Sequence, residues 1–261
     1  MTSSPLISII TPSFFSEKHI EECIKSVQGQ TYDNWELIVV DGESQDLTVE
    51  IVRNFSQEDD RIRLISNPND DGPAQARSLG LTYAKGEFIA FIDSDDLWLP
   101  TKLDDQVTFM IEHDHYFTFT SYKKMFTNQT LSKAAISGHK SNTYKQYLRR
   151  RGIANSTVML RKECVSAEVL STVGKSHGED TLWWLLIMRQ GFDAFALQKP
   201  LTIYRMVDDS LSTKVMNNQR TVWHSYRNEL NLTIADAAYC YALYLVDVAL
   251  RRAKFLVRNS F

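Results

Sequence analysis

Three carboxylates within four residues are the most chemically informative feature of this sequence. Asp93, Asp95 and Asp96 follow an apolar run at residues 88–92, with Ser94 between the first two. Negative charges at this spacing repel one another unless a cation joins them, and carboxylate oxygens are ligands that suit Mn²⁺ or Mg²⁺. The cluster therefore favours a divalent-metal site. The alternative is an acidic turn that caps the following helix.

The elements that must position this cluster are predicted from the hydrophobic periodicity of the first hundred residues. Strand-like runs alternate with helix-like segments, the strands at residues 6–11, 35–40, 61–65 and 88–92 and the helices at 20–27, 47–55 and 74–84. Repeats of this kind form right-handed crossovers and a largely parallel sheet, so the sequence predicts an α/β fold.

Polar segments follow each of these predicted strands. Ligands of open α/β sheets bind beyond the carboxyl ends of the strands. The segments are Thr11-Pro12-Ser13, Asp41-Gly42, residues 67–72 and the acidic cluster, with Arg77 one helical turn beyond the third. We expect them to form one site.

The pattern is looser after residue 100. Helices are expected at residues 102–112, 181–190 and 234–257, strands at 115–122 and 158–161, and a loop at 127–142. We divide the chain into a domain at 1–213, with halves at 1–100 and 101–213, and a C-terminal helical extension at 214–261.

The overall composition excludes several classes of protein. The 261 residues, 43% hydrophobic and 23% charged, are typical of a globular enzyme and not of a coiled coil or a disordered chain. A net charge of −3 gives no electrostatic basis for nucleic-acid binding. Three widely separated cysteines indicate a reducing compartment, and no targeting segment or membrane span is recognisable. The expected location is the cytoplasm, or peripherally the cytoplasmic face of the inner membrane.

Five segments resemble, in order, the motifs of the inverting glycosyltransferase family 2. They are residues 8–13 (SIITPS), 36–44 (ELIVVDGES), 76–80 (ARSLG), 86–98 (GEFIAFIDSDDLW) and 178–180 (GED). The resemblance implies the GT-A fold, a mostly parallel central sheet flanked by helices. It covers residues 5–110 well, extends more weakly to about 213 and is absent from the tail.

The resemblance also implies a set of donor-binding residues. Main chain and hydroxyls around Thr11, Pro12 and Ser13, with Asp41, are expected to hold the uridine of a UDP-sugar. Arg77 is expected near the base or the diphosphate. In the acidic cluster, Asp93 is expected on the ribose side with Ser94 next to it, Asp95 on Mn²⁺ or Mg²⁺, and Asp96 in support. The alternatives are a simple Asp-Gly turn at Asp41 and a surface ion pair at Arg77.

Asp180 is the expected catalytic base. Inverting transfer requires a carboxylate that takes the proton of the acceptor hydroxyl as its oxygen attacks the anomeric carbon. Glu179 is a second candidate beside it. The alternative is that both residues only stabilise the N-terminus of the helix at 181–190.

Further residues are weaker candidates for acceptor contact. Trp98, Trp183 and Trp184 have aromatic faces that suit a sugar ring, and His177 precedes the acidic pair; the alternative for each is a structural role. Relatives commonly carry a histidine where this chain has Val207, and Arg205, Asp208 or Ser210 is a candidate substitute. Arg149-Arg150-Arg151 is either a solvated face or a grip on an anionic acceptor.

The tail has its own charge pattern. Residues 214–261 contain seven Lys or Arg against three acidic residues, together with an apolar stripe at helical spacing. This composition suits an amphipathic helix on anionic lipid. The alternatives are packing on the catalytic domain or on a second subunit in a homodimer.

The sequence thus predicts a metal-dependent inverting transfer of a sugar from a UDP-sugar to a glycan or a polyprenyl-diphosphate-linked saccharide. By family resemblance the product belongs to bacterial O-antigen (lipopolysaccharide), capsule or exopolysaccharide. Two alternatives are a sugar-phosphate nucleotidyltransferase and an inactive sugar-nucleotide-binding module. The first requires a Gly-rich basic loop after the first strand, where this chain has Thr11-Pro12-Ser13-Phe14-Phe15.

Overall fold

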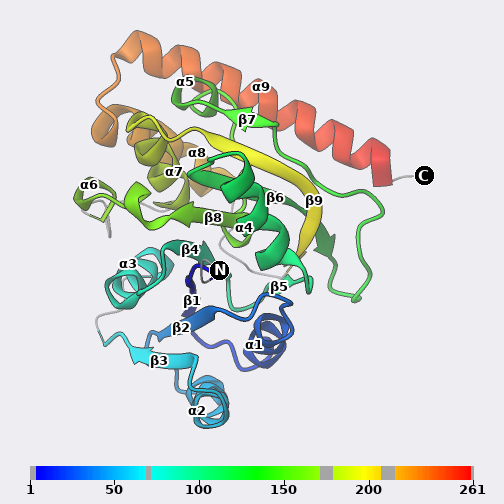
Figure 1. Ribbon diagram of the computed structural model, residues 1–261. Coiled ribbons are helices and arrows are strands. Elements are labelled where there is room, and N and C mark those ends of the chain that lie inside the picture. Colours follow the sequence, from blue (N-terminus) through cyan, green and yellow to red (C-terminus); the bar gives the residue numbers. More distant parts are fainter. Residues whose placement is uncertain (1–3, 69–71, 171–178, 207–214, 260–261) are drawn as a thin grey trace.

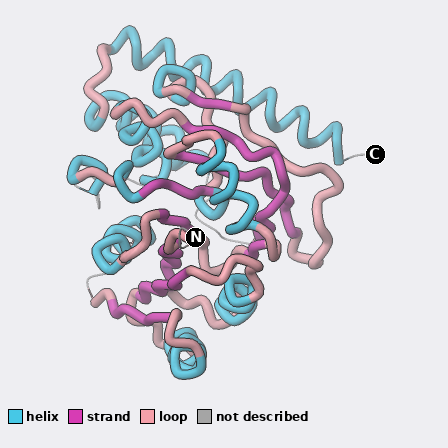
Figure 2. Tube along the Cα trace, viewed as in Figure 1, coloured by secondary structure: helices cyan, strands magenta, loops and turns pink. Residues whose placement is uncertain are grey.

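The structure is a computed structural model that describes residues 4–68, 72–170, 179–206 and 215–259 (Figure 1). Its centre is a sheet with the strand order β3-β2-β1-β4-β8-β6-β9-β5, in which β7 also pairs with β9. Helices cover both faces of the sheet, as Figure 2 shows.

The described strands and helices have the following bounds. The strands are β1 (Ile7–Ser13), β2 (Trp35–Asp41), β3 (Ile62–Ser66), β4 (Phe88–Phe91), β5 (Leu97–Trp98), β6 (Phe117–Met125), β7 (Ser141–Asn142), β8 (Val158–Arg161) and β9 (Ala194–Arg205). The helices are α1 (Ile20–Gln28), α2 (Thr48–Glu58), α3 (Pro73–Tyr83), α4 (Lys102–Glu112), α5 (Tyr144–Tyr147), α6 (Ala167–Leu170), α7 (Glu179–Arg189), α8 (Val215–His224) and α9 (Ile234–Asn259). Short helical turns are η1 (Asn155–Thr157), η2 (Lys162–Cys164) and the π-helical η4 (Ser225–Glu229).

The amino-terminal half confirms the predicted α/β alternation. β1 pairs in parallel with β2 and β4, and β2 in parallel with β3. β1 extends beyond the predicted end and passes through Pro12. Ile10 accepts a hydrogen bond from the backbone of Ile92, so position 12, two residues on, faces the same side, where β4 has already ended. The missing N–H of proline therefore costs no ladder hydrogen bond.

The second half of the sheet is mixed, whereas the first half is parallel as predicted. β8 runs antiparallel to β4 and β6, and β5 and β7 run antiparallel to β9, while β6 and β9 are parallel. The long strand β9 is absent from the sequence prediction. Its register against β6 shifts between Leu197 and Pro200, so the polar residues at 198–199 bulge outward and interrupt the apolar pattern.

Alternate side chains of each central strand enter two separate cores. On β1 and β2, Ile10, Ile38 and Val40 pack with α3, α7 and the C-terminal helices. Their neighbours, including Ile9 and Val39, pack with α1, α2 and α4 on the opposite face. This two-residue period is typical of a sheet covered on both faces.

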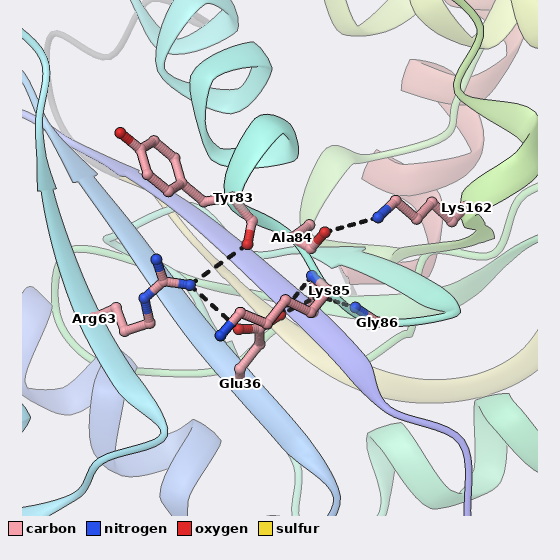
Figure 3. A network of polar contacts seen from close by, with 8 residues as sticks. Glu36, Arg63, Tyr83, Ala84, Lys85, Gly86 and Lys162 are labelled. Atoms are coloured by element: carbon pink, nitrogen blue, oxygen red, sulfur yellow. Dashed lines mark hydrogen bonds and ion pairs between the residues drawn. The ribbon is translucent and has the colours of Figure 1, made fainter.

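A polar network fixes the starting ends of the central strands (Figure 3). The buried Glu36 carboxylate accepts hydrogen bonds of 2.7 Å from Ser8 Oγ and from the backbone N–H of Lys85. Gly86 donates to Ser8 Oγ, and a Cβ at position 86 would lie 2.6 Å from the backbone of Leu6. Only glycine permits this approach, which sets the entry of β4 and hence the position of the acidic cluster at its other end.

Candidate active site

Arg77 and Asp93 form the ion pair that joins α3 to the acidic cluster after β4. Arg77 Nη2 lies 2.6 Å from Asp93 Oδ1, and the arginine is almost fully buried. The same oxygen accepts a 3.0 Å hydrogen bond from Asn155 Nδ2, and the backbone N–H of Asp93 donates to Ser156 Oγ. Asp93 is thus held in one orientation by groups from two segments, α3 and η1.

Asp95 and Asp96 differ in what holds them. Asp96 is buried and its Oδ1 accepts a 2.9 Å hydrogen bond from the backbone N–H of Arg205. Burial, followed by the charge of Asp93, raises the pKa of Asp96 well above its ordinary value and that of Asp95 to about 6. Within the described ranges, only its own backbone N–H donates to the Asp95 carboxylate. Asp95 is therefore the carboxylate of the cluster that is free to bind something else.

These residues fit a divalent cation. No group of three or more His, Cys, Asp or Glu side chains in the described segments is arranged to hold a metal ion. Mg²⁺-like ions, however, typically bind one or two carboxylates and complete their coordination with substrate phosphates and water. Asp95 and the second oxygen of Asp93 match that partial ligand set, and a cation would relieve the repulsion that raises the pKa of Asp95.

Asp41 ends β2 with its carboxylate turned toward β1. Its Oδ2 accepts hydrogen bonds from Ser13 Oγ at 2.7 Å and from Ser44 Oγ at 2.8 Å, and its Oδ1 accepts from the backbone of Ser44. Thr11 is buried beside it, and its hydroxyl has no hydrogen-bond partner within the described segments. Pro12 lies between Thr11 and Ser13 on β1. The predicted uridine-binding residues are therefore together at the carboxyl ends of β1 and β2.

Ser94 is also part of this rim. Its Oγ lies 2.8 Å from Ser16 Oγ in the loop after β1. The contact joins the acidic cluster to the Thr11–Ser13 end of β1, so three of the four polar segments predicted from the sequence border one another.

Asp180 is half-buried in the first turn of α7. Its Oδ1 accepts a 2.7 Å hydrogen bond from the backbone N–H of Thr181. Burial raises the pKa of the Asp180 carboxyl; the charge of Arg77 and the hydrogen bond from Thr181 lower it, and the charge of Asp93 raises it further. Asp180 thus lies within electrostatic reach of the Arg77–Asp93 pair. The Glu179 side chain and all of His177 lie outside the described residues.

Arg205 has a different role from the predicted acceptor contact. It is buried, its Nε donates to the backbone oxygen of Asp95 at 2.8 Å, and its Nη2 pairs with Glu22. Its own backbone N–H holds Asp96. Arg205 therefore positions the acidic loop from β9. The other proposed substitutes, at positions 208 and 210, lie outside the described residues.

The tryptophans predicted as sugar platforms are core residues. Trp98 is buried, donates to the Ser156 backbone oxygen at 2.8 Å and has Lys102 Nζ 3.7 Å from its ring centroid. Trp183 and Trp184 are also buried and both pack against Phe91. α7 is apolar nearly all round because it is enclosed between the sheet and other helices, so neither ring faces a cleft.

Asn155 and Ser156 are the site residues that the sequence prediction missed. They come from η1, a single turn before β8. The only sequence signal is a polar triplet directly before an apolar run. Both residues contact Asp93, which is too distant in the sequence for a local pattern to reveal their role.

A cavity lies at the end of the sheet opposite to the candidate site. Its volume is about 430 Å³, and it is lined by residues 85–88 and 161–163. These residues surround the starting end of β4, whereas the acidic cluster follows its carboxyl end, so this cavity is separate from the site.

The comparisons with known proteins agree with this geometry. Over 98% of both chains, the sequence is 35% identical to "UDP-Glc:alpha-D-GlcNAc-diphosphoundecaprenol beta-1,3-glucosyltransferase WfgD" of Escherichia coli. The fold is similar to Staphylococcus aureus TarS in complex with UDP-GlcNAc (TM-score 0.66, 21% identity, 92% of this chain and 71% of that one). It is also similar to the mannosyltransferase PcManGT of Pyrobaculum calidifontis in complex with GDP-Man and Mn²⁺ (TM-score 0.67, 15% identity, 97% and 76%).

The fold is thus that of the GT-A glycosyltransferases, as the sequence predicted. The family model described as glycosyl transferase family 2 matches residues 8–166. The chain belongs to this family, and it is a glycosyltransferase.

Proposed function

We propose that this enzyme transfers a sugar from a UDP-sugar, with inversion, to a hydroxyl of a saccharide carried on polyprenyl diphosphate. The proposal is supported by the name of the full-length E. coli relative and by the UDP-GlcNAc complex of the similar TarS structure. The observation that carries it is that Asp180, from α7, lies within electrostatic reach of Arg77 and Asp93, from α3 and β4. A base and a nucleotide-binding rim at one site are what single-displacement transfer requires.

In this proposal the donor lies along the carboxyl ends of β1, β2 and β4. The Thr11 hydroxyl and Asp41 hold the uridine, because a carboxylate accepts the hydrogen bond of a base N–H. Ser13, fixed by Asp41, and Pro12 shape the edge of this pocket, and Asp93 and Ser94 lie beside the ribose. Arg77 is directed at the diphosphate by its hydrogen bond to Asp93.

Asp95, with Asp93, would hold Mn²⁺ or Mg²⁺. When bound, the ion supplies positive charge that stabilises the departing diphosphate. Arg205 and Asp96 keep the acidic loop in place for this purpose.

Asp180 is the proposed base. Its partly enclosed position raises the pKa of the carboxyl, which strengthens it as a proton acceptor, while the charge of Arg77 lowers the pKa. Glu179 is adjacent in the chain and is the alternative base. In this scheme residues 1–100 bind the donor, 101–213 bind the acceptor and 214–261 form an extension.

The proposed acceptor is attached to lipid, so we place the enzyme at the cytoplasmic face of the bacterial inner membrane, in O-antigen, capsule or exopolysaccharide assembly. No helix in the described ranges is both long and apolar enough to span a bilayer. α9 runs along the outer edge of the molecule (Figure 1) and supplies an alternative contact. Its outward residues are apolar and exposed: Ile234, Ala235, Ala238, Tyr239, Ala242, Leu245, Val246, Ala249, Leu250 and Ala253.

The spacing of three and four residues places all ten on one face of α9. An exposed apolar helix face requires a covering. Arg149, whose guanidinium is 5.0 Å from the Tyr239 ring, and the exposed Lys254 add positive charge at its border. Apolar and basic groups together match an anionic bilayer surface, so we propose that α9 lies on the membrane. A homodimer through the same face is the competing outcome.

A panel of UDP-sugars tests the proposed function. Thermal shifts measured with Mn²⁺ identify the donor, and transfer from that donor to a synthetic α-GlcNAc-diphosphate-alkyl acceptor tests the reaction. NMR of the product establishes the anomeric configuration. Retention of configuration, or the absence of UDP-sugar binding with Mn²⁺, would contradict the proposal, whereas hydrolysis without transfer would favour an inactive binding module.

A further inference from the structure

The Arg149-Arg150-Arg151 segment is not a solvated face. All three residues are half-buried, and each has a buried Nε without a hydrogen-bond partner in the described part of the chain. Arg149 stacks on the Tyr239 ring of α9, and Arg150 lies 3.3 Å from His139 Nδ1. Each of these two side chains therefore already contacts another residue of the protein. Arg151 has different neighbours, which the side chains of two tyrosines provide.

Arg151 is fixed between aromatic rings. Its guanidinium carbon lies 5.1 Å from the Tyr226 ring centroid and 5.3 Å from that of Tyr244. Tyr226 is itself anchored by a hydrogen bond to the backbone oxygen of Leu148. The stem of Arg151 is therefore held, while Nη2 and Nε have no acceptor within the described segments. A half-buried cation with unused donors is costly unless an anion binds there.

Arg151 lies on the acceptor side of the proposed base. α5, which ends four residues before Arg151, packs against α7, whose first turn carries Asp180. The charge of Arg151 is close enough to lower the pKa of Asp180. Tyr147, the last residue of α5, is affected by both charges: burial raises the pKa of its hydroxyl, Asp180 raises it further, and Arg151 and Arg251 lower it.

Arg251 adds a second positive charge at the same place. A Cβ built on Gly152 would lie 2.8 Å from Arg251 Nη1, so this side chain reaches from α9 to the residue after Arg151. Asp247 neutralises Arg251 through a 2.8 Å contact, and Asp93 neutralises Arg77 in the same way. Of these three arginines, only Arg151 has no carboxylate partner in the described ranges.

We infer that Arg151, with Arg251 beside it, binds the diphosphate of the acceptor. In a monosaccharide acceptor the diphosphate is attached to the same ring that presents its hydroxyl to Asp180, so the anion must lie within one ring's width of the base. Arg151 is the cation at that place with donors to spare, and a guanidinium fork matches two phosphate oxygens. The inference rests on the proposed function, and it restricts the acceptor to diphosphate-linked saccharides.

Two acceptors test this inference, α-GlcNAc-diphosphate-alkyl and the neutral α-GlcNAc-alkyl glycoside. Arg151→Gln is expected to raise KM for the first about tenfold to a hundredfold, the loss of one or two charge-assisted hydrogen bonds. KM for the UDP-sugar is expected to remain unchanged. Transfer to the neutral glycoside is expected to change much less than transfer to the diphosphate acceptor, and only through the effect of the lost charge on the pKa of Asp180. Arg151→Lys, which keeps the charge but not the fork, is expected to recover part of the loss. Arg53→Gln on the exposed face of α2 is the matched control.

Each contrary result is distinct. Equal losses on both acceptors assign Arg151 a structural role and overturn the inference. A wild-type enzyme that uses both acceptors equally well also overturns the inference, but it leaves the proposed sugar transfer intact. Titration of the UDP-loaded protein with the diphosphate acceptor gives a second readout, in which unchanged affinity of the Gln variant also overturns it. An enzyme that binds UDP-sugars but transfers to neither acceptor removes the inference and the proposed acceptor class together.

Discussion

Arg77 Nη2 and Asp93 Oδ1 are 2.6 Å apart, and this contact holds together two residues of the proposed donor site. Arg77 belongs to the helix before β4 and Asp93 to the loop after it. The charges of both residues shift the pKa of Asp180, which lies on the distant α7: Arg77 lowers it and Asp93 raises it. The pair therefore links the nucleotide side of the site to the proposed base, and the first predictions concern these groups.

Asp180→Asn is expected to retain UDP-sugar binding and to lose transfer by about 10²–10⁴-fold, the usual loss when a general base is removed. The amide keeps the shape of the side chain but cannot accept the proton. Rates of transfer and the Kd for UDP, measured on the same preparation, check this. Glu179→Gln is the neighbouring control, expected to keep most of the activity. The opposite ranking of the two variants would move the base to Glu179.

Asp95→Ala is expected to abolish the dependence of UDP affinity on Mn²⁺ and leave the fold intact. Within the described residues its carboxylate receives a hydrogen bond only from its own backbone N–H, so its removal breaks no hydrogen bond to another residue of the loop. Calorimetric titration of UDP with Mn²⁺ and with EDTA measures the effect. Asp60→Asn, an exposed carboxylate in the turn before β3, is the matched control. An Asp95 variant that still binds UDP more tightly with Mn²⁺ would exclude Asp95 as the ligand.

The raised pKa of Asp95 has a consequence for stability in the absence of metal. With a pKa of about 6 in the folded protein against 3.8 ordinarily, the folded state holds the proton more tightly than the unfolded chain. Protonation therefore stabilises the fold at low pH, and this contribution is lost as the pH rises from about 4 to 6. Asp59, with a pKa of about 2, acts with the opposite sign and only below about pH 4.

Thermal melts of wild type and Asp95→Asn in EDTA isolate this contribution. Because His19 has a lowered pKa and acts with the opposite sign, the quantity to compare is the difference in Tm between the two proteins. The Asn variant is expected to gain Tm relative to wild type as the pH rises from 4 to 6. A difference that stays constant over this range would show that Asp95 is not destabilised by its surroundings.

Much of the nucleotide-binding half could be predicted from the sequence because its signals are local. β2 and β4 are nearly continuous apolar runs; Asp41 is the last residue of β2, and Asp93 follows β4 after Ile92. Period and turn chemistry suffice there.

The rest of the site depends on contacts between distant segments. Arg205 reaches Asp95 and Asp96 only because the bulged β9 returns beside β5, and the bulge itself conceals the strand. The sequence could not decide between a sugar contact and a core role for the two tryptophans of α7 for a related reason. An aromatic residue on a helix has the same local signature in a core as in a sugar site, and only the enclosure of α7 distinguishes them.

The exposed face of α9 gives the last prediction. Val246→Glu places a negative charge in the middle of the ten apolar residues, where it opposes both burial in lipid and attraction to anionic headgroups. It is expected to reduce binding to phosphatidylglycerol vesicles at least tenfold in a sedimentation assay, with transfer to a water-soluble acceptor unchanged. Ile111→Glu on α4 is the matched control, because Ile111 is 53% exposed and Val246 55%.

Vesicles of neutral phosphatidylcholine separate the charge contribution from the apolar one, since only the anionic surface attracts Arg149 and Lys254. Analytical ultracentrifugation tests the competing occupant. If wild type forms a concentration-dependent dimer that Val246→Glu dissociates, and neither protein binds vesicles, the face is a subunit interface. A helix of this kind pairs closely through its alanines at positions 235, 242 and 249, which repeat every seven residues. Binding to a membrane does not require this seven-residue repeat. Ala242→Leu enlarges the exposed apolar face of α9, so it is expected to weaken a dimer but to strengthen binding to lipid.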